Sequence, residues 1–209
     1  MTTRYLNLSV ILLAFAMAIP AMAKGPVYTD PTQADEDFAV QGEYVGTVTA
    51  EGQDHEIGVQ VIALGNGKFR SVSLLGGLPG AGWDGTTRFE HEGGREGDKV
   101  TIKGDHAIAT IADGKMTIAS LDGDEMGSLE RIVRESPTLG KQPPEGAVVL
   151  FDGTNVEQWK NGRKTDDGLL MQGTTSIPKF GSHKLHLEFL LPYQPEARGQ
   201  GRGNSGLYM

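Results

Sequence analysis

The chain of 209 residues contains no cysteine. This absence excludes a disulfide framework, a zinc site built from thiolates and a cysteine nucleophile within these residues. It also excludes a lipid-modified cysteine at an export cleavage site. Any catalysis or metal binding must therefore depend on other side chains.

Basic side chains are in the minority, because 19 Lys and Arg stand against 27 Asp and Glu, a formal net charge of -8. The chain shows no basic stripe interleaved with aromatic residues, and its negative balance repels a polyanion. We therefore predict that nucleic acid is not a partner. An acidic balance of this kind is typical of soluble proteins with neutral substrates or partners.

The first 23 residues are typical of a signal peptide. Arg4 supplies a basic start, residues 6–19 form an apolar run shorter than the ~20 residues of a membrane span, and Ala21-Met22-Ala23 matches an A-x-A cleavage site. We predict cleavage before Lys24, which leaves no transmembrane anchor and an exported protein, periplasmic or extracellular. An uncleaved anchor helix is the alternative. Cleavage removes one cation, Arg4, so 18 basic side chains remain against 27 acidic ones, a net charge of -9.

The rest of the chain has the pattern of an all-β protein. Its 30 glycines and turn dipeptides such as Asn66-Gly67 and Asp113-Gly114 divide it at hairpin spacing. Short runs between these turns alternate apolar and polar side chains, and no window after the signal peptide shows a helical stripe. The strands expected in the first half are Gly42–Ala50, His55–Leu64, Lys68–Leu75, Thr87–His91, Lys99–Lys103, Ala107–Ala112, Lys115–Ser120 and Gly127–Val133.

After the signal peptide, composition predicts two folded regions, with a lead-in before the first and a linker between them. Residues 24–37 are expected to be a poorly ordered lead-in. Residues 38–136 form a domain whose eight short strands predict a small barrel or sandwich. Two adjacent prolines cannot lie in a central strand, so residues 137–146 are interpreted as a Pro-rich linker. The role of the first domain is open, and Trp83 in its glycine-rich loop fits either a core position or a stacking surface for a sugar.

The second region, residues 147–209, contains motifs in a distinctive order. These are the apolar run 148–150, Phe151-Asp152-Gly153, Trp159, the alternating run 184–189 and Gly203-Asn204-Ser205-Gly206. In this order, residues from about 146 to 209 resemble the N-terminal part of the 3-keto-disaccharide hydrolase family. The resemblance implies a concanavalin-like jelly-roll β-sandwich, export, and action on glycosides oxidised at the sugar 3-position. Roughly five strands would form only the incomplete front of such a sandwich, with unpaired edges, so we expect a fragment that is inactive alone.

The run Leu185–Leu191 supplies the first site candidates. Its alternation places the apolar side chains on one face of a strand and His186 and Glu188 on the other. On the concave sheet of a jelly roll, such polar side chains meet ligand, which makes Glu188 the candidate acid or base and His186 a candidate for substrate binding. A solvated carboxylate is the alternative for Glu188. His183 and His186 fall on opposite faces of a strand, so we predict no shared metal site.

Three further residues are candidates for the same site. Arg202 has the charge to polarise a carbonyl oxygen, and Asn204 has both a donor and an acceptor for sugar hydroxyls. The resemblance implies that Asn204 lies at the lip of the groove, and a tight turn with a self-bonded Asn is the alternative. Trp159 fits either a core position or an aromatic platform for a sugar.

The chemistry that the resemblance implies is an elimination next to a ketone. A general base removes the C2 proton, the glycosidic oxygen leaves C1, and water adds to the resulting enone. Glu188 would act as the base or as a metal ligand, and Arg202 as the electrophile. The residues leave open whether a divalent metal takes part. The alternative function is a non-catalytic module that binds carbohydrate or contacts the cell envelope.

Overall fold

The computed structural model describes residues 25–208. The predicted signal peptide, residues 1–23, lies outside the described residues, as does Met209. Strands are the main regular structure of the described chain, and eight of them form one closed antiparallel sheet. The predicted all-β class is therefore confirmed.

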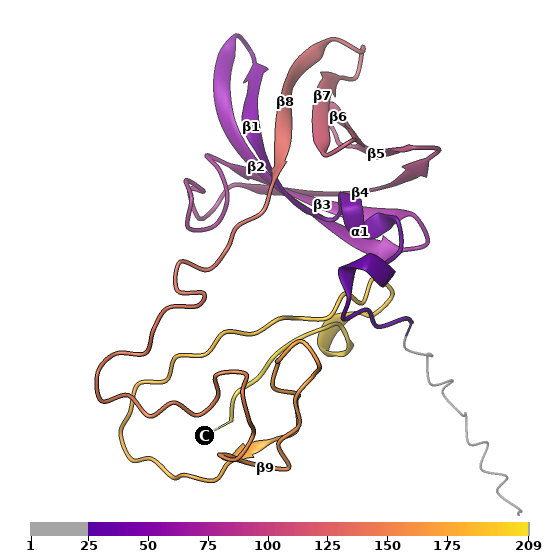
Figure 1. Ribbon diagram of the computed structural model, residues 1–209. Helices are drawn as coiled ribbons and strands as arrows, with labels where there is room; N and C mark the ends of the chain where they lie inside the picture. Colours follow the sequence, from indigo (N-terminus) through magenta and orange to yellow (C-terminus); the bar gives the residue numbers. More distant parts are fainter. Residues whose placement is uncertain (1–24, 209) are drawn as a thin grey trace, which may run out of the picture.

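The sheet is an eight-stranded up-and-down barrel (Figure 1). Its strands are β1 (Gly42–Ala50), β2 (Gln53–Gly65), β3 (Lys68–Leu75), β4 (Arg88–Glu96), β5 (Lys99–Lys103), β6 (Ala107–Ala112), β7 (Lys115–Ser120) and β8 (Glu125–Ile132). Each strand pairs with the next, and β1 pairs with β8 to close the sheet. The structure thus contains a barrel rather than a sandwich, and the eight strands lie where the alternation predicts them.

Tight turns explain why consecutive strands pair. The β2–β3 turn contains Asn66 and Gly67, with φ values of 55° and 69°, and the β6–β7 turn contains Asp113 and Gly114, with 49° and 76°. Two consecutive residues of positive φ match the twist of a two-residue hairpin, and Asn, Asp and Gly tolerate that conformation best. These dipeptides therefore direct β3 back along β2 and β7 back along β6.

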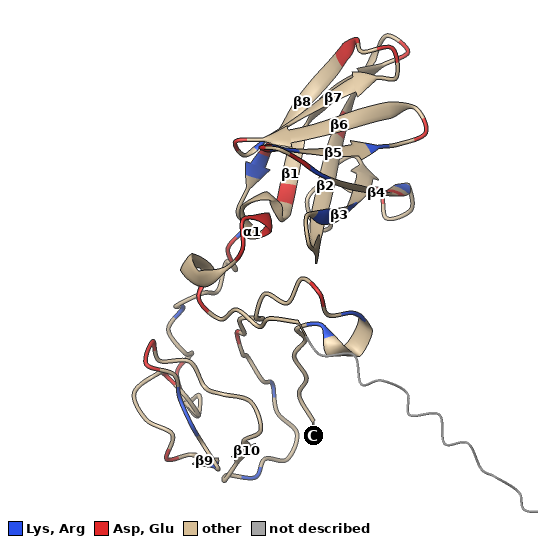
Figure 2. Ribbon diagram, turned by 90° about the vertical axis from the view of Figure 1, so that its right-hand side faces the viewer, with Lys and Arg blue, Asp and Glu red and all other residues tan. Residues whose placement is uncertain are grey.

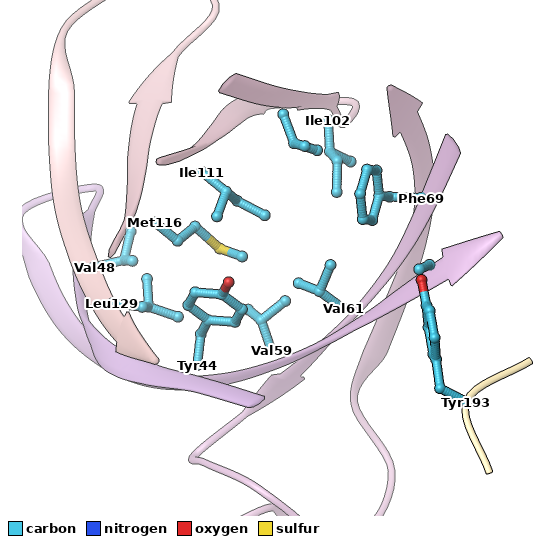
Figure 3. Packing of buried hydrophobic residues seen from close by; sticks show 12 residues of the cluster. Tyr44, Val48, Val59, Val61, Phe69, Ile102, Ile111, Met116, Leu129 and Tyr193 are labelled. Carbon is cyan, nitrogen blue, oxygen red and sulfur yellow. The ribbon is translucent and has the colours of Figure 1, made fainter. Parts of the chain in front are cut away.

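Side chains fill the interior of the barrel (Figure 3). The buried hydrophobic cluster consists of Tyr44, Val48, Val59, Val61, Ala63, Phe69, Val100, Ile102, Ile111, Met116, Leu129 and Tyr193. Its barrel members alternate with outward residues along each strand, as a half-buried sheet requires. Only Tyr193 comes from the second region, and Figure 3 shows it beside the barrel on the C-terminal segment. The barrel core is thus the main source of hydrophobic stabilisation.

A smaller cluster lies on the outside of the barrel, under the glycine-rich β3–β4 loop. Val72, Leu74 and Leu78 are buried there, and Trp83 packs against them. The Trp83 indole N–H donates to the Thr87 carbonyl at 3.1 Å. Trp83 therefore holds a structural position, which agrees with the core interpretation of this residue.

The lead-in before the barrel differs from the poorly ordered segment that was expected. It contains the 3-10 helix η1 (Pro31–Gln33) and the short helix α1 (Asp37–Val40). Asp37 is 3% exposed and accepts hydrogen bonds from the Arg95 guanidinium and the Gly67 amide. Contacts with the barrel, which local composition does not reveal, anchor this segment.

Within residues 25–208, no helix has the length and apolar character needed to cross a membrane.

The second region has little regular structure, in contrast to the strands predicted there. It contains β9 (Trp159–Lys160) paired with β10 (Thr175–Ser176), and the 3-10 helix η2 (Gly199–Gly201). Residues 147–151 and 185–191 form no strand, and Val148 and Phe189 are 63% and 64% exposed. An alternating pattern becomes a strand only when another strand satisfies its backbone groups, and the described residues supply none. The region lies beyond one end of the barrel (Figure 1 and Figure 2).

Candidate functional site

The structure brings two predicted site residues together with two hydroxyl groups. Glu188 Oε1 accepts hydrogen bonds from Ser136 Oγ at 3.0 Å and Thr138 Oγ1 at 2.7 Å. His186 Nε2 lies 3.5 Å from the same oxygen. The side chain of Glu188 is 26% exposed and that of His186 is 64% exposed. We call these four residues the Glu188 cluster.

The Glu188 cluster has the parts of an acid–base site. Two hydroxyl donors orient one carboxylate oxygen, and within the described residues the other oxygen accepts no hydrogen bond. The imidazole of His186 lies beside this carboxylate, and its ring nitrogens can donate or accept a hydrogen bond. The predicted common orientation of His186 and Glu188 is therefore present, although the strand expected to produce it is not.

Sequence reasoning missed Ser136 and Thr138. Both flank Pro137, where the predicted first domain ends and the Pro-rich linker begins. Thr138 lies 50 positions from Glu188 in the chain, so no local pattern joins them. The only sequence signal for these two residues was the presence of two hydroxyl side chains in a segment that otherwise has the composition of a linker.

The predicted role of Arg202 as an electrophile is not supported, because its guanidinium is bonded to the end of the barrel. Nη2 donates to the Ala63 carbonyl at 2.9 Å and to Gln41 Oε1 at 3.2 Å. Nη1 donates to the Pro195 carbonyl at 3.3 Å. Burial, with a further contribution from the charge of Arg198, lowers the pKa of Arg202. Among the described residues, Arg202 makes no hydrogen bond or ion pair with the Glu188 cluster.

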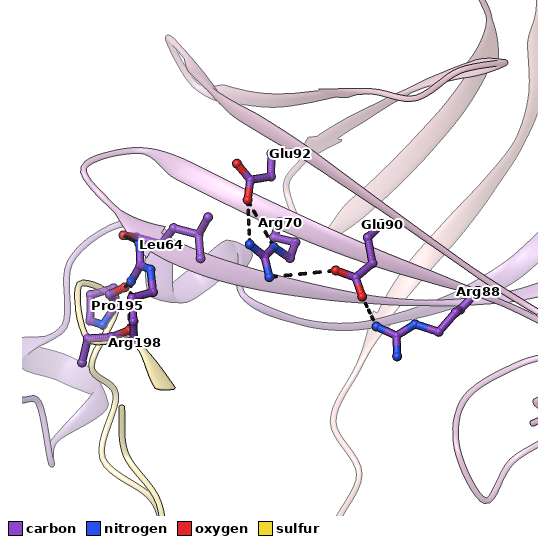
Figure 4. A network of polar contacts seen from close by, with 8 residues as sticks. Leu64, Arg70, Arg88, Glu90, Glu92, Pro195 and Arg198 are labelled. Atoms are coloured by element: carbon purple, nitrogen blue, oxygen red, sulfur yellow. Dashed lines mark hydrogen bonds and ion pairs between the residues drawn. The ribbon is translucent and has the colours of Figure 1, made fainter. Parts of the chain in front are cut away.

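Residues 193–202 form a docking segment that attaches the second region to the barrel. Arg198 Nη2 donates to the Leu64 carbonyl at 2.7 Å, as Figure 4 shows. Tyr193 is 7% exposed, stacks on Tyr28 and donates from its hydroxyl to Asp35 Oδ1 at 2.9 Å. Burial and the hydrogen bond to Asp35 raise the pKa of Tyr193. The lead-in and the docking segment thus cover one end of the barrel together.

The position of Arg202 leads to a prediction about stability. We expect Arg202→Ala to lower the free energy of unfolding by about 1–3 kcal/mol, because carbonyl groups at the barrel end lose a charged donor. Urea unfolding followed by circular dichroism measures this change. Arg163→Ala is the control, since Arg163 is exposed and makes one long bond to the Gln172 carbonyl. Equal stability of the Arg202 variant and the wild type would contradict the docking role.

The two remaining predicted residues are also held by structural contacts. Asn204 Nδ2 donates to the carbonyls of Gln200 at 2.7 Å and Arg202 at 3.1 Å, which matches the self-bonded turn. Trp159 is half-buried, and its indole N–H donates to the Leu150 carbonyl at 2.7 Å. These contacts favour the structural alternative for both residues.

The described residues contain no group of three or more His, Asp or Glu side chains arranged to hold a metal ion. His186 and Glu188 supply two donor groups at one place. The neighbouring His183 is turned to the Gly181 carbonyl, 2.7 Å from its Nδ1 atom.

No family model, no curated protein and no solved structure matches this chain. The resemblance of residues 146–209 therefore depends on their motifs alone.

Proposed function

We propose that the protein, when intact, is an exported carbohydrate-active hydrolase or lyase that cleaves 3-keto-glycosides at the Glu188 cluster. The observation that supports this function is the convergence of an imidazole and two hydroxyl groups within 3.5 Å of one carboxylate oxygen, Glu188 Oε1. An oriented carboxylate of this kind can act as a general base.

The proposed reaction begins at the carbon next to the ketone. The free oxygen of Glu188 takes the C2 proton, and the electron pair of that C–H bond moves toward the ketone as an enolate. The enolate then expels the glycosidic oxygen from C1, and that oxygen leaves with a proton as the free aglycone. Water adds across the C1–C2 double bond and regenerates a 3-keto sugar. The electron count balances without an external oxidant or reductant.

The side chains of the cluster have distinct roles in this proposal. Ser136 and Thr138 hold the carboxylate of Glu188, so that its second oxygen points to the substrate. His186, whose Nε2 atom lies 3.5 Å from Glu188 Oε1, would protonate the leaving oxygen. Arg202 takes no part, because its guanidinium is bonded to the barrel.

The test is release of aglycone from a 3-keto-glucoside that carries a chromogenic leaving group. Glu188→Gln in the full-length protein should reduce turnover by about 100- to 10,000-fold, the usual contribution of a positioned general base. Glu157→Gln, which changes an exposed carboxylate outside the cluster, should retain full turnover. Absence of release by well-folded, full-length wild-type protein would refute the enzyme proposal.

A second candidate is a non-catalytic carbohydrate-binding or envelope interaction module. The exposure of the apolar side chains at Leu187, Phe189 and Leu190, which are 47%, 64% and 69% exposed, favours it. Such surfaces mark interaction sites in soluble proteins. Turnover measured beside calorimetry separates the two candidates, because a binding module should bind saccharide in the wild type and in Glu188→Gln and show no turnover in either.

A further inference from the structure

A row of hydroxyl side chains crosses five neighbouring strands of the barrel. The strand register pairs Thr101 with Thr110, Thr110 with Thr117, Thr117 with Ser128, and Ser128 with Thr47. The row therefore runs through β5, β6, β7, β8 and β1 without interruption. We call these five residues the hydroxyl row.

The hydroxyl row points away from the core. Each member is next in sequence to a buried residue of the barrel interior: Ile102, Ile111, Met116, Leu129 and Val48. Successive side chains of a strand point to opposite faces, so the hydroxyl groups lie on the outer surface. Each member is half-buried or exposed.

Four of the five hydroxyl groups have unused hydrogen-bonding capacity. Thr47 donates to Glu56 Oε1 at 2.8 Å. The side chains of Thr101, Thr110, Thr117 and Ser128 make no hydrogen bond to any residue in the range 25–208. Adjacent strands lie about 4.8 Å apart, so the four free groups form a line about 14 Å long. Their spacing is comparable to the length of one pyranose unit.

The middle of the hydroxyl row lies in a depression of about 420 Å³ on the barrel surface. Thr110 and Thr117 line it together with the small side chain of Ala112. Charged residues of both signs complete its lining: Lys99, Lys115, Asp113 and Glu130. Within the described residues, neither lysine pairs with a carboxylate. The depression thus offers hydroxyl, ammonium and carboxylate groups to a polar ligand.

The opposite part of the barrel surface has a different character. On β3 and β4, Arg70 pairs with Glu92 at 2.8 Å and with Glu90 at 3.9 Å, and Arg88 pairs with Glu90 (Figure 4). Those charges satisfy one another. Strands β6 and β7 carry few charged residues and are mostly tan in Figure 2. The charged side chains of β3 and β4 thus pair with one another, whereas four hydroxyl groups of the hydroxyl row have no partner among the described residues.

We propose that the hydroxyl row and its depression bind a neutral polysaccharide chain. Two cations and two anions line the depression, so a polyanion gains no net attraction there. The lining contains no apolar centre of the kind that protein interfaces need. A glycan, in contrast, presents hydroxyl groups at regular intervals that both donate and accept.

This function is separate from the proposed catalysis at Glu188. The hydroxyl row belongs to the barrel, whereas the Glu188 cluster lies in the linker and the second region. The barrel would hold the protein on a polysaccharide, while the second region would bind and cleave smaller glycosides. A test of binding at the hydroxyl row therefore does not depend on turnover at the Glu188 cluster.

The experiment is affinity electrophoresis of the full chain in native gels that contain a neutral glucan, mannan or xylan. Calorimetry with an oligosaccharide of the retarding polymer then gives the Kd. Thr110→Val with Thr117→Val removes two hydroxyl groups at nearly constant volume, and should weaken binding by roughly tenfold or more through two lost hydrogen bonds. Thr110→Ser with Thr117→Ser keeps both hydroxyl groups and should retain most of the affinity.

Thr49→Val is the matched control, because Thr49 lies on the outer face of β1 outside the hydroxyl row. Circular dichroism should show the same fold for all variants, since valine suits an outer strand position. Loss of retardation in the double valine variant alone supports the proposal. Equal retardation of the double valine variant and the wild type overturns it, as does retardation by polygalacturonate alone or by no polymer.

Discussion

Phe69→Ala is expected to lower the free energy of unfolding by about 3–5 kcal/mol, the usual cost of truncating a buried phenylalanine. Phe69 is 0% exposed inside the barrel, and the Arg95 guanidinium lies 5.8 Å from its ring centroid. The truncation removes apolar contacts and leaves a cavity that a closed barrel cannot easily collapse. Because small domains have about 5–15 kcal/mol of stability in total, much of the barrel's stability would be lost. Urea unfolding followed by circular dichroism measures the effect.

Phe89→Ala is the control for this prediction. Phe89 lies on neighbouring strand β4 but is 58% exposed, so its removal should change stability by less than about 0.5 kcal/mol. A similar loss in both variants would mean that the interior packing does not distinguish the two positions. The interior assigned to Phe69 would then be wrong.

Asp37→Ala should have the second large effect, a loss of about 3 kcal/mol, as is typical when one member of a buried ion pair is removed. Asp37 Oδ1 accepts from Arg95 Nη2 at 2.7 Å and from Arg95 Nε at 3.0 Å, and Asp37 Oδ2 accepts from the Gly67 amide at 2.9 Å. Removal of the carboxylate leaves the Arg95 side chain, only 15% exposed, without its main partner. Thermal and urea unfolding both report the change.

Glu36→Ala provides a control next to Asp37. Glu36 lies 3.4 Å from the same arginine, but its side chain is 75% exposed, so a loss below about 1 kcal/mol is expected. The double variant Asp37→Ala with Arg95→Leu should recover part of the stability, because the unpaired charge is also removed. Equal losses in the Asp37 and Glu36 variants would show that burial of the pair does not matter.

Local patterns predict the barrel strands well for a physical reason. Strand alternation and turn dipeptides are properties of short segments, and hairpins join neighbours in sequence. The predicted strands Gly42–Ala50 and Lys68–Leu75 match β1 and β3 at both ends. The same alternation fails at residues 185–191, because a strand also needs a partner with free backbone groups.

The candidate site was predicted only in part, because most of it depends on contacts between distant residues. Glu188 and His186 are two positions apart, and local spacing was enough to pair them. Ser136 and Thr138 reach Glu188 from about 50 positions away. Arg202 was predicted as an electrophile from its charge, but its barrel partner Ala63 lies 139 positions earlier.

The sequence by itself determined the all-β class, the positions of the eight barrel strands and the composition break after them. These features follow from side-chain periodicity and turn chemistry, which act over a few residues. Only the tertiary structure decided that β1 pairs with β8, that Tyr193 joins the core, and that five hydroxyl residues align in one row. Each of these depends on register or packing between distant segments, and the free energy of such contacts appears only when the whole chain is folded.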